Sequence, residues 1–159
     1  MRFVIQCVRD ARVTISEEEA AAAGTGTTTG EIRQGMLVLI GVNDSDTEET
    51  AQRMVRKMLK LRIFEDSEGK TNLDLAAVGG SLLLVSQFTL YADVRKGNRP
   101  SFVRAGDPAH AQALYQYITD LCRSQGYAVE TGVFGAYMHV SMTNEGPFTL
   151  IMDSEELGY

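Results

Sequence analysis

Two short segments of this chain carry residues that could act on a ligand. Ser86-Gln87-Phe88-Thr89 places polar residues where the most apolar run, at residues 82–85, leaves the predicted core. Hydroxyls, an amide and main-chain N–H groups at a strand end can bind a ligand, or can simply satisfy one another. The second segment, residues 143–149, contains Gly146-Pro147, the one Gly-Pro step in the sequence.

The Gly-Pro step lies between two β-patterned runs. Glycine adopts backbone angles closed to other residues, while proline fixes its own φ and allows a cis peptide bond. A turn of this kind holds main-chain groups in a fixed geometry, and such groups could test the shape and chirality of a ligand. The simplest interpretation of the turn alone is a hairpin connection with no further role.

The sequence offers no conventional nucleophile with its base. Attack by serine or threonine needs a base within hydrogen-bond reach and a group that orients it. The two histidines are His110, on the polar side of a predicted helix, and His139, on a predicted strand. We expect both to be structural or surface residues.

Metal and cofactor motifs are also missing from the pattern. Cys7 and Cys122 lie far apart without Cys/His spacing, so we expect two reduced core thiols and no zinc site. Gly24-Thr25-Gly26 lacks the strand-to-helix context of a phosphate-binding loop. We therefore expect neither a metal nor a cofactor.

Composition limits the class of protein. The chain has 159 residues, 44% hydrophobic and 23% charged, which suits one domain with a substantial core. Its net charge of −6 argues against non-specific nucleic-acid binding by the overall field, although the basic loop at residues 95–104 could contact phosphates. No apolar run is long enough for a membrane span, and residues 1–6 do not resemble a signal peptide, so we expect a cytoplasmic protein.

Periodicity predicts an α+β fold with mostly antiparallel, barrel-like β-sheets and two main helices. Strands are expected at residues 2–8, 11–15, 35–42, 61–64, 81–92, 129–134, 137–142 and 148–153. One helix is expected to begin at Asp46, with Glu49 completing a capping box. The other is expected to begin at Asp107-Pro108 and to end near Gly126.

The chain reads as a single domain over residues 1–159. Residues 16–30 are rich in Glu, Ala, Gly and Thr and contain no large apolar residue. This low-complexity composition predicts a mobile surface loop without a catalytic role.

Several motifs, in the same order along the chain, resemble the D-aminoacyl-tRNA deacylase family. They are SLLLVSQFTLYA at 81–92, RKG at 95–97 with RPSF at 99–102, GVFGAYM at 132–138, and NEGPFT at 144–149. GMLVLIGV at 35–42 and LRIFED at 61–66 agree with it. The resemblance covers nearly the whole chain except residues 16–30 and the last few.

The resemblance implies a homodimeric enzyme that hydrolyses the ester between a D-amino acid, or glycine, and the 3′-terminal adenosine of tRNA. In this family one subunit supplies the residues around the scissile ester, which here are Ser86, Gln87, Phe88 and Thr89. The other supplies a cis Gly-Pro segment whose main chain rejects L-amino acids, here Gly146 and Pro147. The main-chain carbonyl of Phe134 is expected near the substrate ammonium.

The shortage of bases fits such a reaction. An ester beside a 2′-hydroxyl is activated, and the RNA can assist its own hydrolysis while the protein supplies positioning and oxyanion donors. We assign the donors to the main-chain N–H of Phe88 or Thr89. The alternative assignment is Thr89 as a nucleophile.

The chain departs from the family pattern at Cys7, where family members usually carry an arginine that is thought to hold the Gly-Pro segment. This departure leaves open a deacylase with a trans Gly-Pro bond and relaxed chirality. A non-catalytic module that binds RNA ends or nucleotides through residues 95–104 is a further alternative, and a structural scaffold is another.

Overall fold

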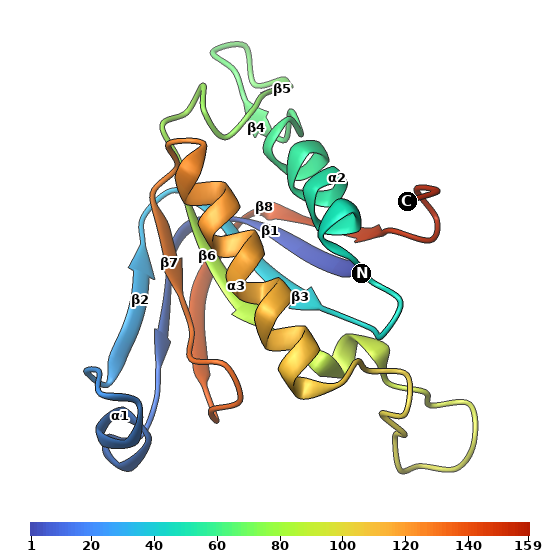
Figure 1. Cartoon of the computed structure of the whole chain (residues 1–159). Coiled ribbons are helices and arrows are strands. Elements are labelled where there is room, and N and C mark those ends of the chain that lie inside the picture. The colour runs from blue at the N-terminus through green and yellow to red at the C-terminus, as the bar shows by residue number, and fades with distance from the viewer.

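A curved, mixed β-sheet forms the centre of the molecule (Figure 1). The computed structural model describes all residues from 1 to 159. The strands of the sheet are β1 (Arg2–Thr14), β2 (Thr28–Ile32), β3 (Gly35–Gly41), β6 (Ser81–Ser86), β7 (Val129–Thr131) and β8 (His139–Asp153). Two short strands, β4 (Phe64–Glu65) and β5 (Thr71–Leu73), pair separately.

Strand pairing confirms an α+β domain and adds a parallel part to the predicted sheet. The long strand β1 pairs antiparallel with β2, β3 and β8. By contrast, β6 runs parallel to both β3 and β7. Each parallel pair is joined by a connection that contains a helix, which is the length of chain that parallel pairing requires.

The sheet closes on itself into a barrel-like shape. The two ends of the strand order, β2 and β7, approach each other at Gly30, where a Cβ atom would lie 2.7 Å from the carbonyl oxygen of Thr131. Only glycine permits this close approach. The closed part encloses a small apolar core of Val8, Ala11, Val13, Ile32, Leu37, Leu83 and Val85.

Two long helices cover one face of the sheet, as predicted (Figure 1). Helix α2 (Glu48–Leu59) buries the predicted apolar stripe of Ala51, Met54, Val55, Met58 and Leu59. Helix α3 (Pro108–Ser124) begins at the predicted cap, where the Asp107 carboxylate accepts from the N–H groups of Ala109 and His110. It ends one residue before its cap, Gln125, and Gly126 follows with a left-handed φ of 88°.

The predicted capping box of α2 is wrong. Thr47 is the cap, and its hydroxyl accepts from the Thr50 N–H. Asp46 is instead buried, where its carboxylate accepts from the α-ammonium of Met1 and from the Asn43 N–H. A buried charge needs such partners, and this need overrides the local capping pattern.

Residues 16–30 are not the mobile loop that we expected. They form helix α1 (Glu17–Ala23) and the first residues of β2. Ser16 and Glu19 make a reciprocal capping box, and Gly24 ends the helix in the left-handed conformation. Alanine and glutamate are strong helix formers, and one buried residue, Ala20, suffices to attach the short helix, so no large apolar residue marks it.

Several predicted strand boundaries also change. The expected strand at 61–64 is reduced to Phe64–Glu65, and β6 ends at Ser86 before the 3₁₀ helix η1 (Phe88–Tyr91). The two strands expected at 137–142 and 148–153 are one continuous strand, β8. None of the helices combines the length and the apolar character that crossing a bilayer would require.

Candidate active site

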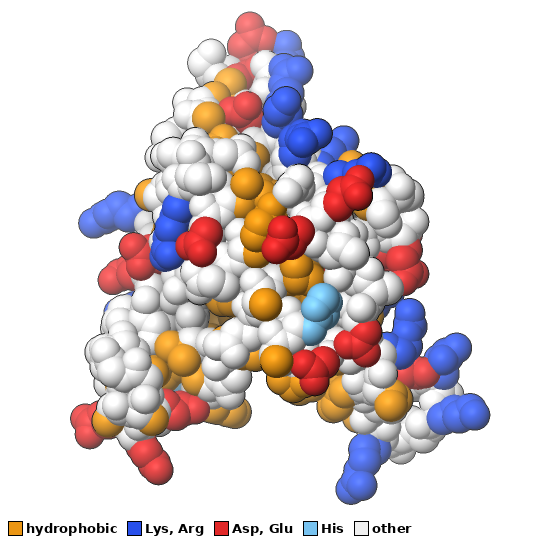
Figure 2. Space-filling model, viewed as in Figure 1, with side chains coloured by type: hydrophobic (Ala, Val, Ile, Leu, Met, Phe, Trp, Pro, Cys, Tyr) orange, Lys and Arg blue, Asp and Glu red, His pale blue; other side chains and the backbone are white.

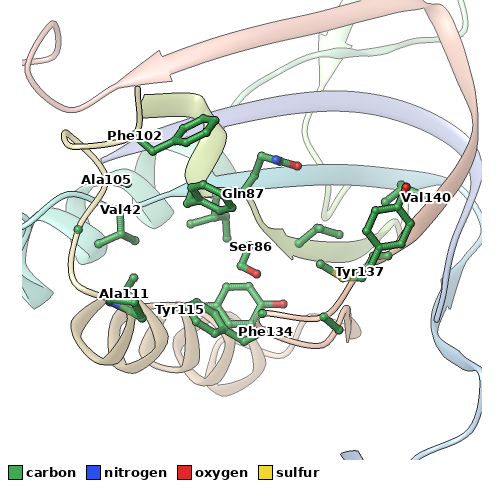
Figure 3. A pocket seen from close by; sticks show the side chains of 18 residues that line it. Val42, Ser86, Gln87, Phe102, Ala105, Ala111, Tyr115, Phe134, Tyr137 and Val140 are labelled. Atoms are coloured by element: carbon green, nitrogen blue, oxygen red, sulfur yellow. The ribbon is translucent and has the colours of Figure 1, made fainter. Parts of the chain in front are cut away.

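A pocket of about 540 Å³ opens between η1, helix α3 and the connection from β7 to β8 (Figure 3). Most of its walls are apolar, with side chains from β3, from the loop before α3 and from α3 itself. Ser86, Gln87 and Phe88 line it on one side, and residues 134–138 line it on another. The pocket is therefore built from segments that the sequence places about fifty residues apart.

The Ser86–Thr89 segment enters the pocket because β6 ends there. Ser86 is the last residue that pairs with β3, opposite Ile40, and its side chain points into the pocket. The side-chain amide of Gln87 donates to the Thr89 hydroxyl. Thr89 itself is exposed and does not line the pocket, so the structure brings three of these four residues to it.

Two main-chain N–H groups of this segment are available to a ligand, one on Phe88, which lines the pocket, and one on the neighbouring Thr89. The Gln87 N–H donates to the Ile40 carbonyl at 2.7 Å, and the Leu90 N–H donates to the Gln87 carbonyl at 3.3 Å. Between them, the N–H groups of Phe88 and Thr89 have no acceptor within the protein. Unpaired N–H groups are usual in the first turn of a helix, and here they can stabilise a developing negative charge.

Phe134 forms the opposite wall. Its ring packs against that of Tyr115, with centroids 6.1 Å apart, and its main-chain carbonyl accepts no hydrogen bond from the protein. The Tyr115 hydroxyl donates to the Leu84 carbonyl at 2.7 Å, and burial raises the pKa of this phenol, so it stays protonated. Tyr115 thereby links α3 to β6, and it lines the pocket between the Ser86 side and the Phe134 side.

Gly146 and Pro147 are not in this pocket. They lie in an exposed bulge of β8, because Gln6 of β1 pairs with Thr149 and Val8 pairs with Asn144. Four residues of β8 therefore stand opposite one residue of β1. The hairpin interpretation of the Gly-Pro step is wrong. Its peptide bond is cis, as the resemblance implies, and not trans as the relaxed-chirality alternative requires.

The bulge is closed by Asn144, which sequence reasoning did not single out. Its Oδ1 accepts from the Phe148 N–H at 2.7 Å, and its Nδ2 lies 3.4 Å from the Phe148 carbonyl oxygen and 3.3 Å from Thr149 Oγ1. Cys7, directly opposite, turns its thiol to the other side and donates to the Ile63 carbonyl at 3.6 Å. An asparagine two residues before a Gly-Pro step was the available signal, since asparagine commonly bonds to nearby backbone.

No side chain at the pocket pairs a nucleophile with a base. His110 Nε2 contacts the Asp46 carbonyl at 3.1 Å, and His139 packs edge-on against Tyr137. Neither histidine bonds to Ser86 or Thr89. Nor do three or more His, Cys, Asp or Glu side chains gather anywhere in a way that could hold a metal ion.

A basic loop projects beside the pocket. Asp93 and Ser101 exchange two main-chain hydrogen bonds that close its base, and Arg95 binds the Asp93 carboxylate through two nitrogens. The hydrogen bonds from Arg95 hold the pKa of that carboxyl well below its usual range. The remaining cations point into solvent (Figure 2), so the loop presents a positive end on an acidic molecule. They are Lys96, Arg99 and Arg104.

With this geometry in place, comparison with known proteins decides the family. The sequence model of the D-Tyr-tRNA(Tyr) deacylase family matches residues 4–153. The chain belongs to this family. It is similar to the D-aminoacyl-tRNA deacylase of Bifidobacterium animalis subsp. lactis (strain AD011), with 48% identity over 158 residues and 99% of each chain covered.

Two further comparisons show that sequence similarity alone does not establish activity. A Bacillus subtilis (strain 168) protein named "Inactive D-aminoacyl-tRNA deacylase" is 53% identical over 126 residues, covering 79% of this chain and 96% of that one. A solved structure named "c-Myc DNA Unwinding Element Binding Protein" superposes with a TM-score of 0.84 at 36% identity, covering 96% and 98% of the two chains. High identity thus occurs with an inactive relative, and activity has to be argued from the site.

Proposed function

We propose that this protein hydrolyses the ester bond of D-aminoacyl-tRNA, and of glycyl-tRNA, to release the free amino acid and tRNA. The observation that carries the proposal is the pair of unpaired N–H groups on Phe88, which lines an apolar pocket without a catalytic base, and on the neighbouring Thr89. The names of the full-length relatives support the same substrate. We place the reaction in the cytoplasm, where aminoacylated tRNA is used.

The reaction needs little from protein side chains. Water adds to the ester carbonyl, the carbonyl oxygen becomes an oxyanion, and the 3′-oxygen of adenosine leaves with a proton. The neighbouring 2′-hydroxyl can pass that proton. The N–H groups of Phe88 and Thr89 stabilise the oxyanion, and the Phe134 carbonyl accepts from the substrate ammonium. Ser86 and Gln87 shape the wall beside the ester.

The Gly-Pro bulge lies outside the pocket of its own chain, and this separation supports a homodimer in which a second chain supplies the bulge. β8 pairs on one edge with β1 and leaves its other edge free. Its exposed face carries Val140, Met142 and Ile151, the last with 71% of its surface accessible. A two-fold pair of chains joined through this face would cover the apolar residues and bring Gly146 and Pro147 of one protomer to the pocket of the other.

Chirality is then tested by main-chain atoms. Gly146 and Pro147 of the partner would stand where the side chain of an L-amino acid has to go. Backbone atoms make few distinctions between side chains, so the enzyme would be strict about handedness and tolerant of residue type. The basic loop would contact phosphates near the acylated end of the tRNA.

Hydrolysis of D-tyrosyl-tRNA and L-tyrosyl-tRNA by the purified protein tests the function. We expect release of D-tyrosine and glycine, with no release of L-tyrosine above the spontaneous rate. Equal rates on both tyrosyl esters would exclude chiral rejection. Binding of tRNA without turnover would favour the RNA-end binding alternative, and absence of both would favour a scaffold.

Mixing two defective variants tests the shared site. Ala105→Trp fills the pocket, and Gly146→Ala disturbs the bulge. A mixed dimer keeps one site in which both halves are intact, so random exchange should restore about one quarter of the wild-type activity. A monomer in sedimentation, or no recovery on mixing, would exclude the shared site while leaving the hydrolytic function to be judged by its own assay.

A further inference from the structure

One wall of the pocket is held by a residue far away in the sequence. The connection from β7 to β8, residues 132–138, supplies Phe134 and its neighbours to the pocket. Between Phe134 and Met138 it makes only two hydrogen bonds, the first of them a 3.3 Å bond from the Ala136 N–H to the Val133 carbonyl. The second is a 2.7 Å bond from the Tyr137 N–H to Oε1 of Glu19 in α1.

Burial holds the two ends of this segment but not its middle. Phe134 and Met138 pack against the two hydrophobic cores, whereas the Tyr137 side chain is 76% accessible and pairs with the ring of His139. A loop with few buried contacts and few hydrogen bonds opens easily. The bond to Glu19 is therefore the main restraint on the middle of this wall, between Phe134 and Met138.

Glu19 is itself held in a fixed orientation. Its Oε2 accepts from the N–H and the hydroxyl of Ser16, at 3.3 and 3.1 Å, which leaves Oε1 directed at Tyr137. Helix α1 is attached to the barrel by buried Ile15 and Ala20 on either side of the cap. The Tyr137 N–H, followed by Ser16, lowers the pKa of the Glu19 carboxyl, and His139 adds to this, so the group stays ionised near neutral pH.

We propose that Glu19 is a positioning residue for substrate binding, which acts through the Tyr137 N–H to hold the pocket wall and the Phe134 carbonyl. The inference rests on the proposed function, and it gives the 16–30 segment a role in the site. A carboxylate that accepts from a backbone N–H makes a charge-assisted bond, which is stronger than a neutral one.

Steady-state hydrolysis of D-tyrosyl-tRNA by Glu19→Ala tests the proposal. Because the ammonium contact is made in both the ground state and the transition state, its loss should raise KM about fivefold and leave kcat within about twofold. Glu19→Gln keeps an acceptor at the same place and should restore a KM close to wild type. Glu18→Ala removes the same charge from the exposed side of α1 and serves as the matched control.

Two further measurements separate positioning from stability. Ser16→Ala removes the cap of α1 and one of the two bonds that orient Glu19, but it keeps the carboxylate and the Ser16 N–H. KM should therefore rise less than in Glu19→Ala, and an equal rise would assign the effect to the helix and overturn the proposal. Amide exchange at Tyr137 should become about tenfold faster in Glu19→Ala than in Glu18→Ala. Equal exchange in the two variants would overturn the proposal even if the wild-type protein hydrolysed no aminoacyl-tRNA, which would be a failure of the proposed function alone.

Discussion

The Ser86–Thr89 segment and the Gly146–Pro147 segment are both polar interruptions of β-patterned runs, yet the fold treats them differently. The first ends a parallel strand that is covered by α3, so it opens directly into the pocket. The second is a bulge in an edge strand whose outer face is exposed. The difference shows that one chain forms the pocket beside Ser86 and directs the Gly-Pro bulge to solvent. In the proposed homodimer the two segments would meet across the interface.

The largest expected effect is at Gly146. Its φ is +130°, and a Cβ atom there would lie 2.8 Å from the Phe148 nitrogen. Gly146→Ala should displace the bulge and lower kcat/KM for D-tyrosyl-tRNA about 100-fold, since a shift of an ångström at a positioned group can cost that much. Single-turnover hydrolysis measures it. The control is Gly79→Ala, which also has a positive φ but has open space around it and lies away from both segments; a similar loss there would mean general destabilisation.

A smaller loss is expected at Asn144, which closes the same bulge. Asn144→Ala removes the acceptor of the Phe148 N–H and should lower kcat/KM about tenfold. Asn144→Asp keeps that 2.7 Å acceptor and loses only the longer bonds, so it should retain most activity. If both variants behave alike, the bulge does not depend on the Phe148 bond.

Substitutions in the basic loop should reduce activity less than those at Gly146 or Asn144. Lys96→Ala and Arg99→Ala should each weaken tRNA binding by a few-fold and reduce the salt slope of the affinity by about one. Titration of labelled tRNA between low and moderate salt measures this. We expect a shallow slope for the wild type, because the acylated 3′ end supplies most of the affinity, and a steep slope would contradict that assignment.

Thr89→Ala should change kcat by less than about threefold if main-chain groups and the RNA do the chemistry, whereas loss of a true nucleophile costs several orders of magnitude. Rapid-quench measurement of kcat distinguishes the two. An inactive but folded Thr89→Ala protein would establish the nucleophile alternative, and Ser86→Ala provides the matched hydroxyl deletion inside the pocket.

The smallest effect is expected at the thiols. Burial raises the pKa of Cys7 to about 11 and that of Cys122 to about 12. At pH 8 only about one Cys7 in a thousand is then a thiolate, so a disulfide reagent should label neither residue in the native protein and both after unfolding. Rapid native labelling of Cys7 would show that the core opens on the Ile63 side of β1, where the thiol lies.

Sequence patterns predicted the long helices and most core strands. In α2 and α3 the apolar residues recur at helical spacing, so they lie on one face only when the segment is helical, and that face is buried. They missed α1, whose attachment depends on the single small residue Ala20. They also divided β8 in two, because a Gly-Pro step is a turn signal locally, while continuous pairing with β1 makes it a bulge.

The sequence by itself determined the family, the two polar segments and the presence of only two histidines, since these depend on residue types and their order. Only the tertiary structure decided where the segments lie. It placed Ser86 and Phe134 across one pocket and Gly146 outside it, and it brought Glu19 to Tyr137 across 118 positions of sequence. Contacts of that range follow from sheet closure and strand register, which no local pattern encodes.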